Sequence, residues 1–339
     1  MATALCGASI VDDGTIRTLA HPNCPPCRAR GATVYENLRD NFFGAPGDWK
    51  VSRCTQVRCA MLWLNPRPVE DDFWKAYRNY FTHHDRTEPF RANEHGFSRT
   101  TRDAIERTYV ACGKRSATRC ERVLGLLACL DPVRRADTDF PIRYLPREDA
   151  GGLLDLGCGR GELVARMSSL GWRAEGIDTD PVAVEVARSK NIRVRCGPLH
   201  EQKFPQGSFD AVVMSHVIEH VHRPLELLKE VYRILRPGRL LVVATPNAGS
   251  WGHRLLGSRW PFLDPPRHLQ IFTTRALKAL ARAAGFADIH ARTEIRTAAA
   301  MLPLIGYGAI DGRLFAYVEN LALHLGGDLG KEIALVATK

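Results

Sequence analysis

The sequence has no apolar segment long enough to cross a membrane. The longest uncharged stretch near the C-terminus, 297–310, has 14 residues, whereas a spanning helix needs about 20. The first ten residues contain neither Lys nor Arg, so the basic start of a secretory signal peptide is missing. No internal repeat or low-complexity tract stands out. These absences argue against an integral membrane protein or a fibrous repeat, and we expect a cytoplasmic protein.

The composition is that of an ordinary globular protein. Of 339 residues, 45% are hydrophobic and 25% are charged, which excludes a wholly disordered chain and allows two domains. The formal charge of +10 is spread along both halves of the chain. A dispersed excess favours small acidic ligands such as nucleotides. It is not the clustered basic stripe that a nucleic-acid-binding protein presents.

Four regions follow one another along the chain. Residues 1–17 resemble a loose leader, 18–68 a cysteine-bearing module, and 69–148 a mainly helical linker or cap. From 149 to 339, short apolar strands alternate with helices, which predicts a doubly wound, mostly parallel, Rossmann-like sheet of seven strands. The expected strands are 153–156, 173–177, 192–196, 210–214, 240–244, 289–295 and 332–338, and the expected helices are 161–170, 181–189, 225–235, 274–284 and 313–325.

A glycine-rich loop joins the first of these strands to its helix. It reads Gly157-Cys158-Gly159-Arg160-Gly161, and glycines there let the backbone approach a ligand. Asp178 ends the next strand, where a carboxylate can accept hydrogen bonds from ribose hydroxyls. A second acid, Asp155, precedes the first glycine by two positions. That carboxylate is unfavourable beside a pyrophosphate but suits a ligand with an amino group and a sulfonium cation.

Further motifs accompany the loop: Gly176-Ile-Asp178, Ser208-Phe-Asp210, His216-Val-Ile-Glu219-His220 and Leu235-Arg-Pro-Gly238. Together they resemble the class I S-adenosylmethionine (SAM)-dependent methyltransferases, in the branch of the ubiquinone-biosynthesis enzymes. The resemblance covers 151–339 and implies that SAM is the cofactor. One departure is the segment 197–200, where relatives often carry an Asp for adenine. The cofactor-binding residues implied are Asp155, Gly157, Cys158, Gly159, Gly161, Asp178, Thr179, Ser215 and, through its backbone, Leu199.

A second set of polar residues follows the fourth strand. His216, Glu219 and His220 are spaced to share one face if they form a helical turn, and His268 lies in a proline-bearing loop further on. An alcohol or phenol acceptor must lose a proton, so we name these four as candidate catalytic residues. The pattern is also similar to the metal site of small-RNA 2′-O-methyltransferases, and a set so rich in His would favour a softer divalent ion than magnesium. Packing or cofactor-shaping roles stay open.

The N-terminal module carries two close cysteine pairs, Cys24/Cys27 and Cys54/Cys59, separated by 26 residues. Four thiolates at such spacing predict a closed, tetrahedral, structural zinc site. The alternative is four free cysteines. A redox role for the first pair lacks the strand–helix context that it needs. The segment 59–68 is similar to zinc-binding modules that precede SAM methyltransferase domains in bacterial sugar and secondary-metabolite enzymes.

Two inserts, 250–266 and 297–313, follow strands at the ligand edge of the sheet. Their aromatic residues either line an acceptor pocket or form ordinary core, and Arg254, Arg259 and Arg267 are candidates for an acceptor phosphate or carboxylate. We therefore predict a SAM-dependent methyltransferase that modifies a hydroxyl of a sugar, glycolipid or secondary metabolite. The alternatives are a sugar C-methyltransferase, an RNA 2′-O-methyltransferase, and a non-catalytic protein that binds SAM and uses the cysteine module for partner contacts.

Overall fold

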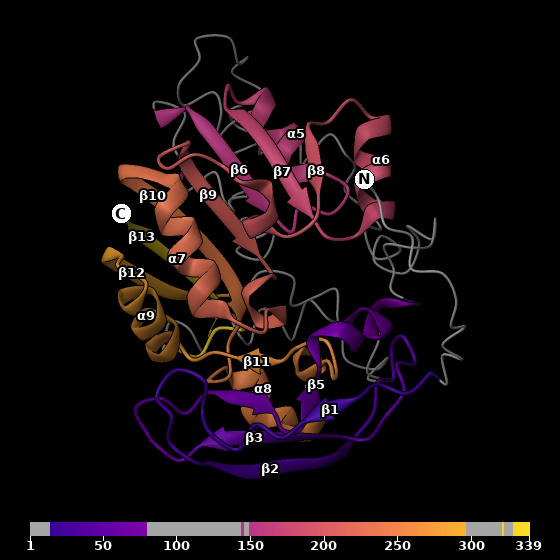
Figure 1. Cartoon of the computed structure of the whole chain (residues 1–339). Coiled ribbons are helices and arrows are strands. Elements are labelled where there is room, and N and C mark those ends of the chain that lie inside the picture. The colour runs from indigo at the N-terminus through magenta and orange to yellow at the C-terminus, as the bar shows by residue number, and fades with distance from the viewer. Residues whose placement is uncertain (1–13, 80–143, 146–148, 296–320, 322–327) are drawn as a thin grey trace.

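The computed structural model describes residues 14–79, 144–145, 149–295, 321 and 328–339. Three sheets are built from these residues (Figure 1): one of seven strands, one of four and one of two. The two smaller sheets lie below the large one in this view, and α8 (Trp251–Leu256) lies in the same lower part of the molecule. Within the described residues no helix is long and apolar enough to cross a membrane.

The large sheet has the strand order β12-β13-β10-β9-β6-β7-β8. Neighbouring strands from β10 to β8 are parallel, and β13 runs antiparallel to both of its neighbours. The parallel strands end at one edge of the sheet, where open α/β sheets bind their ligands. The strands are β6 (Gly152–Leu156), β7 (Arg173–Asp178), β8 (Val194–Cys196), β9 (Phe209–Ser215), β10 (Leu235–Pro246), β12 (Ala287–Glu294) and β13 (Glu332–Thr338).

Helices cover both faces of this sheet, because its strands carry apolar side chains on both sides. On one face Leu153 and Val213 pack with α5 (Glu162–Ser169) and α6 (Pro181–Ser189). On the other face Leu154 and Met214 pack with α7 (Pro224–Ile234) and α9 (Thr274–Ala283). The predicted fold class is confirmed. The strands and four of the five helices lie where the sequence predicts them, and the expected helix 313–325 falls outside the described residues, apart from Leu321.

The N-terminal region folds as short antiparallel strands. β2 (Gly31–Leu38), β3 (Trp49–Cys54) and β4 (Leu62–Leu64) form a sheet, while β1 (Thr18–Leu19) pairs with β5 (Arg67–Pro68). The fourth strand of the larger of these sheets, β11 (Gln270–Ile271), comes from far along the chain and pairs with β4. The regions 18–68 and 149–339, which the sequence separates, therefore share a sheet.

The remaining expected regions are described only in part. Of the linker 69–148, Glu70–Tyr77 forms a 3-10 helix, η1, and residues 80–143 lie outside the described part of the chain. So do residues 1–13 of the leader and the insert 297–313. The other insert holds α8 and two short 3-10 helices, η6 (Gly257–Arg259) and η7 (Pro261–Leu263). Its Trp260 and Phe262 are buried against the N-terminal strands, so the core interpretation is correct for both.

Candidate functional site

The glycine loop closes tightly over the end of β7. The N–H groups of Gly157 and Cys158 both donate to the carbonyl of Ile177, at 2.8 and 3.0 Å. A side chain at position 157 would overlap Val217, because a Cβ there would lie 2.4 Å from Cγ2 of that residue. At Gly159 a Cβ would meet no atom within 4 Å. The loop is thus packed against the turn after β9 on one side and leaves open space above Gly159.

Two acidic side chains lie beside this loop. Asp178 accepts hydrogen bonds from the N–H groups of Gly159 (2.7 Å) and Asp180 (2.9 Å). Asp155 is buried on β6, and burial together with the charge of Asp178 raises its pKa to about 8. Burial also raises the pKa of Asp178. Two crowded carboxyl groups under an open loop fit a ligand that carries positive charge, as the ammonium and sulfonium of SAM do.

The other predicted cofactor residues differ in their exposure. The Cys158 thiol points into the core, since a Cβ at Gly176 would meet its sulfur at 2.5 Å. Only the backbone of Cys158 follows the loop. Leu199 is buried in η4 (Leu199–Gln202), Thr179 is exposed after β7, and Ser215 ends β9 half-buried. Gly161 directly precedes α5.

The chain turns sharply after β9. His216 adopts a left-handed conformation, with φ of 56°, which is uncommon for a residue with a side chain. A 3-10 turn, η5 (Ile218–His220), then follows. The expected helical turn is therefore absent, and His216 precedes the turn instead of sharing a helical face with Glu219 and His220.

The His216 ring lies between two buried carboxylates. Its Nδ1 is 3.2 Å from Glu219, and its Nε2 is 3.1 Å from Glu332 on β13. Burial alone would lower the pKa of His216, but the two carboxylates raise it to about 9. Burial alone would raise the pKa of Glu219, but its hydrogen bond with His216 brings it to about 2. At neutral pH His216 is therefore a cation held by two anions.

His220 and His268 form a separate pair, with ring centroids 4.8 Å apart. Nδ1 of His268 is 2.7 Å from the carbonyl oxygen of Phe262, and Nδ1 of His220 is 3.0 Å from that of Arg267. A carbonyl oxygen can only accept, so both rings carry a proton on Nδ1. Nε2 of His220 is left bare, whereas Nε2 of His268 lies 3.8 Å from Oδ2 of Asp264. Burial and the neighbouring His268 lower the pKa of His220 to about 4. His220 is thus neutral over the physiological range.

Three of the four residues named for a possible metal site lie close together. Donor atoms of Glu219, His220 and His268 lie within 4.8 Å of one another, and His216 is outside this group. Glu219 also accepts a hydrogen bond from the Thr245 hydroxyl at 2.9 Å. Two imidazoles with Nδ1 bound to carbonyls, next to a buried carboxylate, form a donor set that suits a divalent ion.

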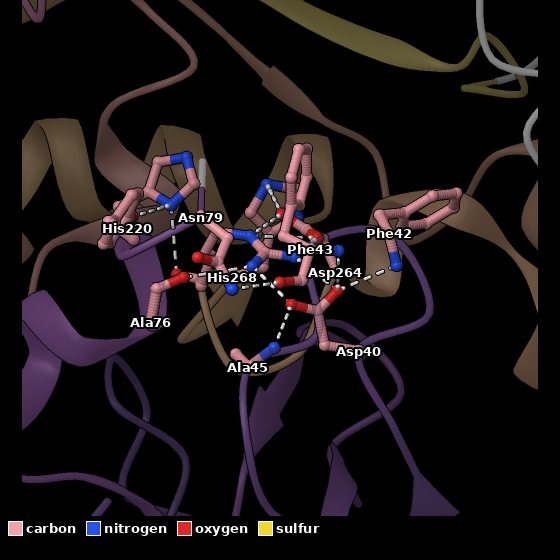
Figure 2. A network of polar contacts seen from close by, with 11 residues as sticks. Asp40, Phe42, Phe43, Ala45, Ala76, Asn79, His220, Asp264 and His268 are labelled. Carbon is pink, nitrogen blue, oxygen red and sulfur yellow. Dashed lines mark hydrogen bonds and ion pairs between the residues drawn. The ribbon is translucent and has the colours of Figure 1, made fainter. Parts of the chain in front are cut away.

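Arg267 joins the His268 loop to the N-terminal region through Asp40 and Ala76, both labelled in Figure 2. Its side chain is fully buried and forms two hydrogen bonds with Asp40, of 2.7 and 3.0 Å, and others with Asp264 and the carbonyl of Ala76. Burial would lower the pKa of Arg267, but the two carboxylates raise it above its usual value. The expectation that Arg267 holds an acceptor anion is therefore wrong, because its guanidinium is already paired with Asp40 and Asp264 inside the protein.

The four predicted metal-binding cysteines come together. Cys24 and Cys27 lie before β2, Cys54 ends β3, and Cys59 precedes β4. The sulfur–sulfur distances are 3.6 Å for Cys24–Cys59 and 3.3 Å for Cys27–Cys54, and the four sulfurs lie within 4.8 Å of one another. Tetrahedral zinc with bonds of about 2.3 Å needs sulfurs roughly 3.8 Å apart, so the donor set fits this ion.

The cysteine cluster is linked directly to the His268 loop. The hydroxyl of Thr273 donates to the carbonyl of Cys59 at 2.6 Å, and the N–H of Leu64 donates to the carbonyl of Leu269 at 3.0 Å. On the other side, the N–H of Leu269 donates to the carbonyl of Glu219. The loop thus connects the N-terminal sheet with the turn after β9.

Sequence reasoning missed three residues of this site. Glu332 holds His216 across the sheet, and nothing in the expected strand 332–338 marked it. Asp264 precedes His268 by four positions, and its Oδ2 lies 3.8 Å from His268 Nε2. Tyr77, at the end of η1, places its hydroxyl 3.0 Å from Nδ1 of His220. Only Asp264 had a signal, as the first residue of the Asp-Pro-Pro-Arg-His segment.

Comparison with known proteins places this geometry in a class. Residues 133–291 match the family model described as a methyltransferase domain. A probable SAM-dependent methyltransferase of Mycolicibacterium smegmatis is 35% identical over 129 residues, which are 38% of this chain and 46% of that protein. A ubiquinone biosynthesis O-methyltransferase of Xanthomonas oryzae is 36% identical over 128 residues, 36% of this chain and 52% of that protein. The chain thus spans about half the length of these curated relatives.

Among solved structures, a SAM-dependent methyltransferase from Archaeoglobus fulgidus aligns with a TM-score of 0.45 and 24% identity, over 58% of this chain and 90% of that one. Three observations point to the same class of protein: the matches to related sequences, the glycine loop, and the strand order of the large sheet. The segment 133–291 is a methyltransferase domain of the SAM-dependent class.

Proposed function

We propose that the protein is a SAM-dependent O-methyltransferase whose acceptor is a small molecule with a hydroxyl group, such as a sugar, glycolipid or secondary metabolite. The observation that carries this proposal is the His220–His268 pair. The Nε2 atom of His220 is bare and belongs to the turn that packs on Gly157 through Val217. A neutral base beside the cofactor loop is what a hydroxyl acceptor requires. The matching relatives named O-methyltransferases support an oxygen acceptor.

The cofactor supplies a methyl group on a sulfonium. Asp178 is positioned to accept hydrogen bonds from ribose hydroxyls, and Asp155 to balance the positive charge of the ligand. His220 or His268 then accepts the hydroxyl proton at Nε2. His216 and Glu219 we assign to holding the turn, because their charges already neutralise each other. The four cysteines we assign to a structural zinc ion.

The first test measures cofactor binding by titration calorimetry. Replacing the ribose partner, D178A, is expected to weaken SAM affinity at least about tenfold, or about 1.4 kcal/mol. The matched control is D48N, which changes an exposed acid far from the loop. Unchanged SAM affinity in D178A would refute the assignment of the cofactor site.

The second test measures release of S-adenosylhomocysteine with a panel of phenols, catechols, sugars and glycolipids. Whichever of H220Q and H268Q removes the base is expected to lower turnover by about 10²–10⁴-fold, while SAM still binds. Full turnover in both variants would overturn the base assignment. An absence of product with every hydroxyl compound, but product with a carbon or RNA acceptor, would overturn the acceptor class.

A metal-assisted variant of this function is favoured by the grouping of Glu219, His220 and His268. A divalent ion held there would supply a Lewis acid for the acceptor oxygen. The test is metal content: the wild-type chain would hold one more ion than H268Q, in addition to the ion of the four cysteines. Equal metal content in the two proteins would leave the metal-free base as the proposal.

A further inference from the structure

His220 has two oxygen atoms within reach of the same ring nitrogen. Nδ1 lies 3.0 Å from the carbonyl oxygen of Arg267 and 3.0 Å from the hydroxyl oxygen of Tyr77. The carbonyl can only accept, which fixes the proton on Nδ1 and makes the phenol oxygen its second acceptor. Both partners therefore act on the side of the ring opposite to the bare Nε2.

Tyr77 reaches this position from outside the methyltransferase domain. It ends η1, whose first turn is held by Asp72, which accepts hydrogen bonds from the backbone and side chain of Arg17 at 2.9 and 2.8 Å. The last turn is held by Arg267, which donates to the carbonyl of Ala76 at 3.1 Å. The Tyr77 ring also packs edge-on against Phe73, at 5.4 Å between centroids. The phenol is thus fixed in place before any ligand binds.

We propose that Tyr77 is a positioning residue for methyl transfer, supplied by the N-terminal region to orient the His220 ring. Its hydroxyl oxygen and the carbonyl oxygen of Arg267 both lie 3.0 Å from Nδ1, and together they fix the direction in which Nε2 points. The inference rests on the proposed role of His220 as the base.

The test compares Y77F with a matched control, Y35F. Tyr35 also bonds a histidine, but as the donor: its hydroxyl lies 3.0 Å from Nε2 of His253, whose Nδ1 is held by the backbone carbonyl of Ala248 at 2.7 Å. The full chain is labelled with ¹⁵N-histidine, and the ring nitrogen resonances of His220 are assigned with H220Q. Y77F is expected to shift the His220 resonances and leave those of His253 unchanged, and Y35F to do the reverse.

Kinetics supply the second readout, with an acceptor found in the panel above. Y77F is expected to slow single-turnover methyl transfer about tenfold, a part of the 10²–10⁴-fold effect of a general base, with SAM affinity unchanged. In the H220Q background, Y77F is expected to have no further effect. Unshifted His220 resonances in Y77F, or equal slowing in both backgrounds, would overturn the proposal. Full turnover of H220Q would instead overturn the function of His220, while the resonances still decide whether Tyr77 orients the ring.

Discussion

Buried acidic residues in this protein fall into two kinds with opposite pKa shifts. Asp155 is buried beside another acid, so burial and repulsion raise its pKa to about 8. Glu219 is buried just as deeply but contacts the charged His216, and its pKa falls to about 2. The first carboxyl is protonated near neutral pH and gains a charge only when a cation arrives. The second is charged throughout and has its partner already in the protein.

The Asp155 shift predicts a pH-dependent affinity for SAM. Below pH 8 the carboxyl is protonated in the free protein, and a cationic ligand favours its ionised form. Affinity should therefore rise with pH, by at most tenfold per unit, and level off near pH 8. D155N is expected to weaken SAM binding about tenfold at pH 8 and to remove the pH dependence, as measured by calorimetry from pH 5.5 to 8.5. A wild-type affinity that is constant over this range would contradict the assignment.

The same shift has a consequence for the stability of the free protein. The folded pKa of Asp155 lies above the unfolded value of 3.8, so its contribution to stability is lost as pH rises toward 8. D155N removes that loss. Urea unfolding at pH 8.5 without ligand is expected to give D155N a higher free energy of unfolding than the wild type. A lower value would mean that the ionised carboxyl has a stabilising partner.

Replacing His216 is expected to lower the stability of the protein, in contrast to replacing Asp155. H216Q leaves Glu219 and Glu332 buried without a cation, at an expected cost of about 3 kcal/mol at pH 7 by urea unfolding. Because the pKa of His216 is raised to about 9, its stabilisation is complete below pH 6.5 and is lost as pH rises through 9. The difference between H216Q and the wild type should therefore shrink at pH 10. H200Q, at an exposed histidine, is the control and is expected to change stability by less than about 0.5 kcal/mol.

At the scale of elements, the segment from Asp264 to Thr273 decides how the site is assembled. It supplies His268, forms β11 in the N-terminal sheet, and contains the buried Arg267. Periodicity gave no sign of β11, because a two-residue strand has no pattern of its own and exists only through pairing with β4. The spacing of 216–220 allowed a helical turn, but His216 is left-handed and only 218–220 forms a 3-10 turn.

Arg267 provides the test at this scale. R267M leaves Asp40 and Asp264 without their cation, and removing one partner of a buried ion pair costs about 3–5 kcal/mol. We expect that loss in urea unfolding. The control is R223M, at an exposed arginine 3.6 Å from Glu226, where a surface pair contributes at most about 1 kcal/mol. Equal losses in the two variants would show that Arg267 does not couple the loop to Asp40.

For the molecule as a whole, the cysteine cluster and the methyltransferase domain are parts of one structure. Cys59 accepts a hydrogen bond from Thr273, next to β11, and Asp40 pairs with Arg267. Disturbing the cluster should therefore change the surroundings of His268, which lies two residues before β11. A module that merely preceded the catalytic domain would have no such effect.

Metal removal tests this connection. C24S is expected to lose one zinc ion per chain by mass spectrometry and to lose a large share of the roughly 10–16 kcal/mol that structural zinc contributes in small modules. The ¹⁵N resonances of the His268 ring are expected to shift as well. C196S, at an exposed cysteine outside the cluster, should retain its zinc. Stoichiometric zinc in C24S would contradict the four-cysteine site.

The sequence by itself determined what is local: the alternation of apolar strands and helices, the glycine loop with Asp155 and Asp178, and the spacing of the four cysteines. Each depends on residues near one another in the chain, where periodicity and backbone freedom act directly. Only the tertiary structure decided which histidines act together. His216 is bound by Glu332, 116 residues away along the chain, and Tyr77 contacts His220 across 143 residues. Charge pairing and burial over such separations leave no trace in a local pattern.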